Sequence, residues 1–178
     1  MWVVILAQNI GIVTGFGLPC VVAINRSGTD GPDELAAVKQ IAMNAGATAA
    51  VECDGFAQGG AGGEDLAQAV VVPCQDKQQI RDAYPTDASA QDKVLALAQK
   101  IYNAADVSWA PEARRKLQHF EENGWGGLPI CMAKTHLSIS HDQSLKGRPG
   151  GHTFPITPIR PPEGDGFLYA LDSRRHTL

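Results

Sequence analysis

The chain has 178 residues, enough for one domain or slightly more with a buried core. Hydrophobic residues make up 44% and charged residues 19%, which excludes a disordered tail, and the 19 glycines follow no collagen-like Gly-X-Y period. Fifteen basic and 19 acidic residues give a net charge of −4, which offers no electrostatic footprint for nucleic acid.

The charge is distributed unevenly along the chain. Residues 1–70 contain two basic and seven acidic residues, whereas the remainder contains 13 basic and 12 acidic ones. The basic residues of the C-terminal part are therefore better placed to meet a small anionic ligand.

The cysteines form no CxxC pair, which disfavours structural zinc and a disulfide scaffold and favours a reducing compartment. They are Cys20, Cys53, Cys74 and Cys131.

Residues 1–15 form an uncharged, apolar N-terminal segment. A signal peptide carries a positive charge before its apolar run, and none is present here. A membrane helix needs about 20 predominantly apolar residues, and this segment is interrupted by Gln8, Asn9, Gly11 and Thr14. We therefore expect a buried element. Attachment to a membrane through residues 1–13 is the disfavoured alternative, which fractionation with and without them would test.

The first strand, loop and helix are predicted after this segment. Leu18–Asn25 is a continuous apolar run, typical of a parallel strand that is covered on both faces. After a polar loop, Pro32 suits the first position of a helix, and two acidic residues behind it favour the positive end of the helix dipole. Apolar residues then recur at helical spacing until Gly46 ends the helix.

The same order then repeats. Ala47–Cys53 predicts a second strand, Asp54–Gly63 a glycine-rich loop, and Glu64–Val72 a helix that ends at Pro73. Alternating strands and helices indicate an α/β fold with right-handed crossovers, in which helices flank a mainly parallel sheet. Residues 73–88 are ambiguous, and we expect a connection and a subdivision of the domain there.

Two helices and a third buried strand are predicted next. Ser89 and Asp92 form a capping-box-like start for a helix that ends near residue 102. Pro111 opens another helix, beside which Trp109 is expected to pack. Leu128–Ala133 then predicts a buried strand.

An irregular strand segment is predicted at the C-terminal end. Residues 138–151 are polar and predict a long loop. Phe154–Arg160 alternates between apolar and other residues, but its two prolines indicate a sheet edge. Phe167–Ala170 predicts a short strand, and residues 171–178 a frayed tail.

Three loops that follow predicted strands mark the candidate site, because open α/β sheets bind ligands outside the carboxyl ends of their strands. Amides near a helix start favour anions, and a loop of glycines lets a ligand approach closely. Lys134 would meet a phosphate or carboxylate as a point charge, and Thr135 would add a hydroxyl. The residues that we single out in the three loops are Ser27, Phe56, Gly59, Gly60, Lys134 and Thr135.

Simpler explanations compete with a ligand-binding role for these loop residues. A glycine-rich loop is more often only a tight connection, and a lysine at a strand end is more often solvated. Residues 59–63 are not a P-loop, because no Gly-Lys-Ser or Gly-Lys-Thr follows them. His136 and His141 have no carboxylate partner at metal-ligand spacing, so no metal site is predicted. Asp30 and Asp33 are better explained as turn and cap residues than as a catalytic pair.

Six segments, with their order and spacing kept, resemble one known family: Leu18–Arg26, Phe56–Gly62, Gln91–Tyr102, Leu128–Ser138, Lys146–Pro149 and Phe167–Tyr169. The family is formate–tetrahydrofolate ligase, or formyltetrahydrofolate synthetase, which also forms the C-terminal part of one-carbon–tetrahydrofolate synthase. The resemblance covers residues 16–170, and we expect residues 1–15 and 171–178 to lie outside it.

The resemblance implies ATP-dependent ligation of formate to tetrahydrofolate, which gives 10-formyltetrahydrofolate through formyl phosphate. It also implies a P-loop-NTPase-like ligase fold, of which this chain would be an internal part without the P-loop and inactive alone. Tetrahydrofolate, formate and ATP would be the small-molecule partners. Phe56 would stack on the ligand ring, Gly59 and Gly60 would line the loop, and Lys134 and Thr135 would face the same cleft.

One departure from the family's pattern bears on this site. The family places a phenylalanine after the Asn-Arg dipeptide and a tryptophan before the Ala-x-Gly-Gly loop, and the two sandwich a flat folate or adenine ring. Here these positions are Ser27 and Phe56. Aromatic pairs contribute about 0.5–1.5 kcal/mol beyond burial, so the loss of one aromatic wall predicts weaker ring binding.

Other functions stay open on the sequence alone. The chain could serve as a non-catalytic module that binds folate or a nucleotide, or as an oligomerisation module. We expect a cytoplasmic location, with the mitochondrion as the alternative, and whether the chain forms a homo-oligomer is open. An assay for formyltetrahydrofolate formation by the purified chain discriminates between the ligase and the module.

Overall fold

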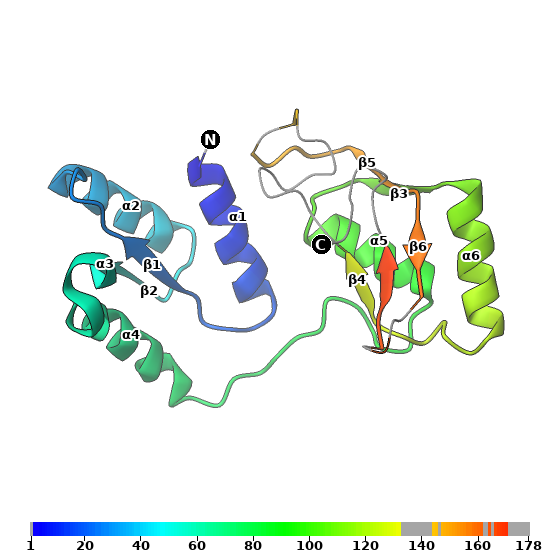
Figure 1. Cartoon of the computed structure of the whole chain (residues 1–178), viewed down its shortest axis with the longest axis horizontal. Coiled ribbons are helices and arrows are strands. Elements are labelled where there is room, and N and C mark those ends of the chain that lie inside the picture. The colour runs from blue at the N-terminus through cyan, green and yellow to red at the C-terminus, as the bar shows by residue number, and fades with distance from the viewer. Residues whose placement is uncertain (1, 133–143, 146, 162–163, 165, 171–178) are drawn as a thin grey trace. The chain divides into compact units, whose positions relative to one another are not determined.

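The computed structural model describes residues 2–132, 144–145, 147–161, 164 and 166–170. The chain divides into two compact units, residues 1–81 and residues 82–178 (Figure 1). The boundary lies within the connection that the sequence predicts at residues 73–88. Because each unit contains its own strands and its own hydrophobic cluster, each is described by itself.

The first unit is a two-stranded parallel sheet with helices packed against it (Figure 1). In this sheet Val21 lies opposite Ala49, and Asn25 lies opposite Cys53. The strand–helix–strand order that the sequence predicts is confirmed. The main elements are α1 (Trp2–Gly15), β1 (Val21–Asn25), α2 (Pro32–Asn44), β2 (Ala49–Cys53) and α4 (Glu64–Cys74).

The core of the first unit joins α1 to α2. Ile10 of α1 is almost fully buried and packs with Ala42 of α2 and with Ala47. Residues 1–15, for which the sequence predicts a buried element of unspecified type, are thus largely a helix that contributes to this core. In the described part of the chain, none of the helices has the length and apolarity that crossing a membrane requires.

Two details of the first unit correct the sequence prediction. Residues 54–63, predicted as a loop, contain the short helix α3 (Gly55–Gln58) and the 3₁₀ helix η1 (Gly59–Gly63). Helix α4 also continues through Pro73, at which it was expected to end. Proline removes one backbone hydrogen bond from a helix, but only Cys74 follows it in α4, so the cost falls on the last turn.

The second unit contains several short strands. Strands β3 and β5 pair in parallel, as do β4 and β7, whereas β6 pairs with β7 in the antiparallel direction. The parallel pairing that the sequence predicts is confirmed, but the strands that the structure describes form three small sheets rather than one. The elements are α5 (Ala90–Lys100), β3 (Asp106–Trp109), α6 (Pro111–Glu122), β4 (Ile130–Met132), β5 (Thr153–Ile156), β6 (Ile159–Arg160) and β7 (Leu168–Ala170).

The start of α5 was predicted correctly from the sequence, whereas β3 was not predicted. The Ser89 side-chain oxygen accepts the backbone N–H of Asp92 at 3.1 Å, as a helix cap does. Strand β3 was not predicted, and Trp109, which was expected beside a helix, lies in it. The strand has only four residues and its apolar signal consists of Val107 and Trp109 alone, which is too short to reveal a period of two.

A buried lysine joins α5 to the turn before β4. The Lys93 side chain is 1% exposed, and its Nζ donates to the carbonyl oxygens of Gly127 at 2.8 Å and Leu128 at 3.3 Å. The same Nζ lies 5.8 Å from the centre of the Tyr84 ring. Tyr84 Oη accepts the N–H of Ile130, the first residue of β4, at 3.1 Å. These contacts hold the beginning of β4 against α5.

Replacing Lys93 with alanine is expected to lower the free energy of unfolding by about 2–4 kcal/mol, because two charge-assisted hydrogen bonds and a buried aliphatic stem are lost. Urea unfolding followed by circular dichroism measures the change. Lys116→Ala is the control, since Lys116 pairs with Glu112 at 2.9 Å between exposed side chains of α6, which contributes at most about 0.5 kcal/mol. Equal losses in the two variants would contradict the role assigned to Lys93.

Candidate functional site

The carboxyl ends of β1 and β2 lie side by side. Asn25 ends β1 opposite Cys53, which ends β2, and the Arg26 N–H donates to the Cys53 carbonyl at 3.0 Å. The pairing therefore continues one residue past β1, and the loops that follow the two strands begin next to each other. Open α/β sheets bind their ligands at this edge.

Backbone contacts close the segment after β2 on itself. The Asp54 N–H donates to the Gly62 carbonyl at 3.0 Å, and the Asp54 carbonyl accepts the Gln58 N–H at 2.9 Å. A β-carbon on Gly62 would lie 2.3 Å from the Asp54 oxygen and 2.5 Å from its carbonyl carbon, so this position requires glycine. Gly59 has a φ of +60°, which glycine adopts readily. The closure fixes helix α3, which carries Phe56, directly after β2.

The two loops form a pocket of about 540 Å³, a volume typical of small-molecule sites. The Phe56 side chain is fully exposed, so it adds nothing to the core of the unit, and its ring is available to a ligand. The pocket brings together Phe56 and Ser27, which the sequence analysis assigned to one site. Its lining residues are Arg26, Ser27, Gly28, Asp30, Asp54, Phe56 and Ala57.

A second pocket of about 250 Å³ has Arg26 and Asp54 in common with the first. Its other lining residues are Glu52, Gln58, Ala61, Gly62 and Asp65. With three carboxylates and one guanidinium, its walls favour hydrogen-bond donors over anions. Across the residues that the structure describes, no three histidine, cysteine, aspartate or glutamate side chains gather as metal ligands.

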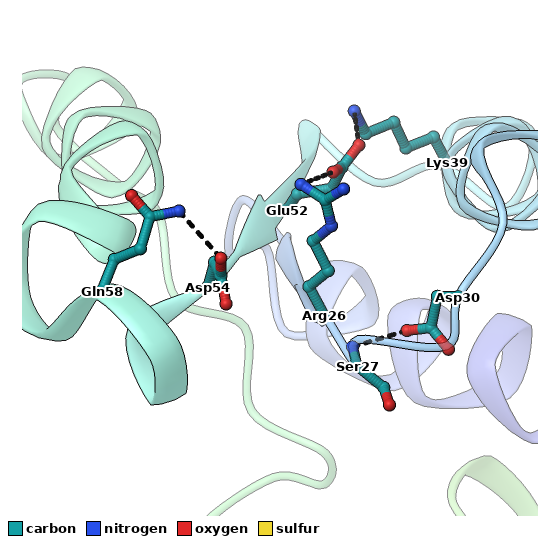
Figure 2. A network of polar contacts seen from close by, with 7 residues as sticks. All are labelled: Arg26, Ser27, Asp30, Lys39, Glu52, Asp54 and Gln58. Atoms are coloured by element: carbon teal, nitrogen blue, oxygen red, sulfur yellow. Dashed lines mark hydrogen bonds and ion pairs between the residues drawn. The ribbon is translucent and has the colours of Figure 1, made fainter.

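Arg26 and Lys39 converge on Glu52 (Figure 2). Lys39 Nζ lies 2.7 Å from Glu52 Oε1, whereas Arg26 Nη1 lies 3.9 Å from Oε2. The pKa of Glu52 is lowered, chiefly because Lys39 donates a hydrogen bond to it. Desolvation opposes this shift, and the charges of Lys39 and Arg26 add to it. Because Lys39 makes the closer contact, the Arg26 guanidinium is only loosely held at the wall that the two pockets share.

Asp30 shapes the loop after β1. Its Oδ2 accepts the backbone N–H of Ser27 at 2.7 Å, and its own N–H donates to the Ser27 carbonyl at 3.1 Å. The hydroxyl oxygens of Ser27 and Thr29 lie 3.2 Å apart. The assignment of Asp30 to a turn is therefore confirmed.

Of the other predicted site residues, those that the structure describes do not line this pocket. Gly59 and Gly60 belong to η1 and do not line either pocket. Strand β4, which precedes the third predicted loop, pairs with β7 in the second unit rather than with β1 or β2. The sheet-edge argument therefore does not extend to that loop. Its residues Lys134, Thr135 and His136 lie outside the described residues, as does His141.

Asp54 is the residue that the sequence analysis failed to single out. It was included only as the first residue of a glycine-rich loop, although it follows β2 directly. The rule that selected Ser27, which places ligand contacts just after parallel strands, would also have selected Asp54. Arg26, which was named only as the last residue of a segment that resembles the family, was likewise given no role.

The chain is an α/β protein with a pocket at the sheet edge of its first unit, and the comparisons with known proteins show its family. Residues 3–178 match the family model described as "Formate--tetrahydrofolate ligase". The relative of that name from Roseiflexus sp. (strain RS-1) is 51% identical over 173 residues, which cover 97% of this chain and 31% of the relative. The chain belongs to the formate–tetrahydrofolate ligase family.

Longer relatives also match most of this chain. The yeast "C-1-tetrahydrofolate synthase, mitochondrial" is 42% identical over 173 residues, covering 97% of this chain and 18% of the synthase. The human "C-1-tetrahydrofolate synthase, cytoplasmic" is 43% identical over 163 residues, covering 92% of this chain and 17% of the synthase. The chain thus spans about a third of the length of the curated ligases that it matches.

The family match also corrects the extent of the resemblance. The sequence analysis placed residues 1–15 and 171–178 outside it, but the match begins at residue 3 and continues to residue 178. The apolar helix α1 therefore belongs to the family's sequence pattern, in agreement with its packing against α2.

Gly62→Ala is expected to lower the free energy of unfolding by about 1–3 kcal/mol, because the added methyl group overlaps the Asp54 carbonyl and breaks the closure of the loop. Thermal unfolding followed by circular dichroism measures it. Gly60→Ala is the matched control, because a β-carbon there meets no atom within 4 Å. Equal stability of the Gly62→Ala and Gly60→Ala variants would show that the closure of the loop does not require glycine at residue 62.

Proposed function

We propose that this chain supplies the ring-binding part of a formate–tetrahydrofolate ligase, in which Phe56 covers one face of the flat ring of tetrahydrofolate. The observation that carries the proposal is a fully exposed phenylalanine in the wall of a pocket at the carboxyl ends of two parallel strands. Because the Phe56 ring does not pack within its own unit, its exposure is better explained by contact with a ligand than by a role in the core. Membership of the family supports tetrahydrofolate as that ligand.

Stacking and desolvation would act together on the Phe56 face of the ring. Ser27, at the position where the family's pattern has a phenylalanine, lines the same pocket from the other loop. Its hydroxyl can donate or accept a hydrogen bond but offers no second aromatic face. The ring is therefore bound by one aromatic wall and one polar wall, which weakens binding relative to a sandwich.

In the proposed reaction, formate takes the γ-phosphoryl group of ATP to give formyl phosphate and ADP. N10 of tetrahydrofolate then attacks the formyl carbon, phosphate leaves, and N10 loses its proton. A P-loop-NTPase-like fold would bind the ATP. Catalysis of phosphoryl transfer depends on groups that position and stabilise the phosphates, and these 178 residues contain no Gly-Lys-Ser or Gly-Lys-Thr. We assign ring binding to this chain and the phosphate chemistry to other parts of a ligase.

Anaerobic calorimetric titration of the chain with tetrahydrofolate tests this proposal, together with an assay for 10-formyltetrahydrofolate from formate, ATP and tetrahydrofolate. Binding without turnover supports the ring-binding role and agrees with the non-catalytic module. Turnover supports the role and extends it to the complete reaction. A chain that is folded and does not bind tetrahydrofolate would contradict the proposal.

Phe56→Ala is expected to weaken tetrahydrofolate binding about tenfold, whereas Ser27→Phe is expected to strengthen it about two- to tenfold by restoring a second aromatic wall. The same calorimetric titration measures both. Phe167→Ala, which removes an exposed phenylalanine of the second unit, is the control and should leave the dissociation constant unchanged. An unchanged constant in Ser27→Phe would count against a ring bound between these two positions.

A further inference from the structure

Asp54 is the one carboxylate that lines both of the pockets described above. Two further acidic residues already have partners, Asp30 in the larger pocket and Glu52 in the smaller one. Asp30 holds the N–H of Ser27, and Glu52 is paired with Lys39. Asp54 accepts one neutral hydrogen bond, from Gln58 Nε2 to its Oδ2 at 2.8 Å (Figure 2).

The Asp54 carboxylate can therefore accept further hydrogen bonds from a molecule in the pocket. A carboxylate has about four lone-pair sites, and the hydrogen bonds made by the described residues engage only its Oδ2. Its backbone is fixed by the hydrogen bonds to Gly62 and Gln58. The acceptor is thus held in place at the end of β2, two residues before Phe56, in the wall of the same pocket.

Resting on the proposed function, we propose that Asp54 is a specificity-determining residue that binds the donor edge of the ring stacked on Phe56. The pterin ring of tetrahydrofolate presents an N3–H beside a 2-amino group, two parallel donors that match the two oxygens of a carboxylate. Such paired, charge-assisted hydrogen bonds are stronger and more directional than single neutral ones.

The same residue discriminates against a purine nucleotide. Adenine presents its 6-amino donor beside N1, which is an acceptor, so a carboxylate in this place would meet one donor and one lone pair. The phosphates of a nucleotide would also meet an excess of carboxylates, because Asp30 and Asp54 face a single Arg26 in the larger pocket. The site therefore selects a pterin over an adenine nucleotide.

Asp54→Asn tests this selection, since the amide keeps the size of the side chain but replaces one acceptor with a donor. The dissociation constant for tetrahydrofolate is expected to rise about tenfold, the effect of losing one charge-assisted hydrogen bond in an open site. The dissociation constant for ADP, used as the purine probe, is expected to stay the same or fall. Calorimetric titration of the whole chain measures both.

Two matched variants separate the direct contact from other effects. Asp65→Asn removes the same charge from the smaller pocket only and is expected to change tetrahydrofolate binding less than about twofold. Gln58→Ala removes the hydrogen bond on Asp54 Oδ2 without changing the carboxylate, and binding is expected to persist. Equal weakening in Asp54→Asn and Asp65→Asn would show a general charge effect and overturn the proposal.

A double-mutant cycle with 6-methyltetrahydropterin and its 2-desamino derivative gives a readout that a structural role of Asp54 would not move. The wild-type chain is expected to lose about tenfold in affinity when the 2-amino group is removed, and Asp54→Asn is expected to lose almost nothing further. Additive losses would overturn the proposal. If Phe56→Ala weakens binding but Asp54→Asn does not, the further inference fails and the proposed function stands; if tetrahydrofolate does not bind at all, both fail.

Discussion

The backbone hydrogen bond between Asp54 and Gly62 is the constraint on which the candidate site depends. It ties the end of β2 to the end of η1 at a distance that leaves no room for a side chain on Gly62. The parallel register of β1 and β2 then places the closed segment beside Arg26 and Ser27. Two local features, a strand register and a glycine contact, are thus sufficient to set Phe56 and Asp54 in one pocket without help from the second unit.

Much of the fold follows from local signals in the sequence. The helix that begins at Pro32 and the cap made by Ser89 depend on neighbouring residues, and both were predicted correctly. Strand β3 and the burial of Lys93 were not predicted, because each depends on distant partners. Strand β3 is formed by pairing with β5, and Lys93 is buried because the carbonyls of Gly127 and Leu128 accept its hydrogen bonds. A lysine in a helical pattern otherwise indicates the solvated face.

The candidate site was predicted in part, for the same reason. Ser27 and Phe56 line one pocket, as expected because the carboxyl ends of adjacent parallel strands meet at one edge, a rule that needs only the order of the elements. That they bind a ligand stays a prediction. The importance of Gly62 was not foreseen, since a run of glycines does not reveal which of them touches a backbone atom. The roles of Gly59 and Gly60 in ligand binding stay predictions. The third loop was grouped with the other two by assuming a single sheet, whereas the described strands form three; Lys134 and Thr135 lie outside the described residues, so their grouping with this site stays a prediction.

The central contact proposed here is that of the Phe56 ring with the ring of tetrahydrofolate. Nuclear Overhauser effects between the Phe56 ring protons and the bound ligand, recorded on the intact chain, test it most directly. We predict cross-peaks from the pterin ring to Phe56 and to the protons of Ser27. Cross-peaks from bound tetrahydrofolate only to residues outside the pocket formed by the two loops would contradict the account.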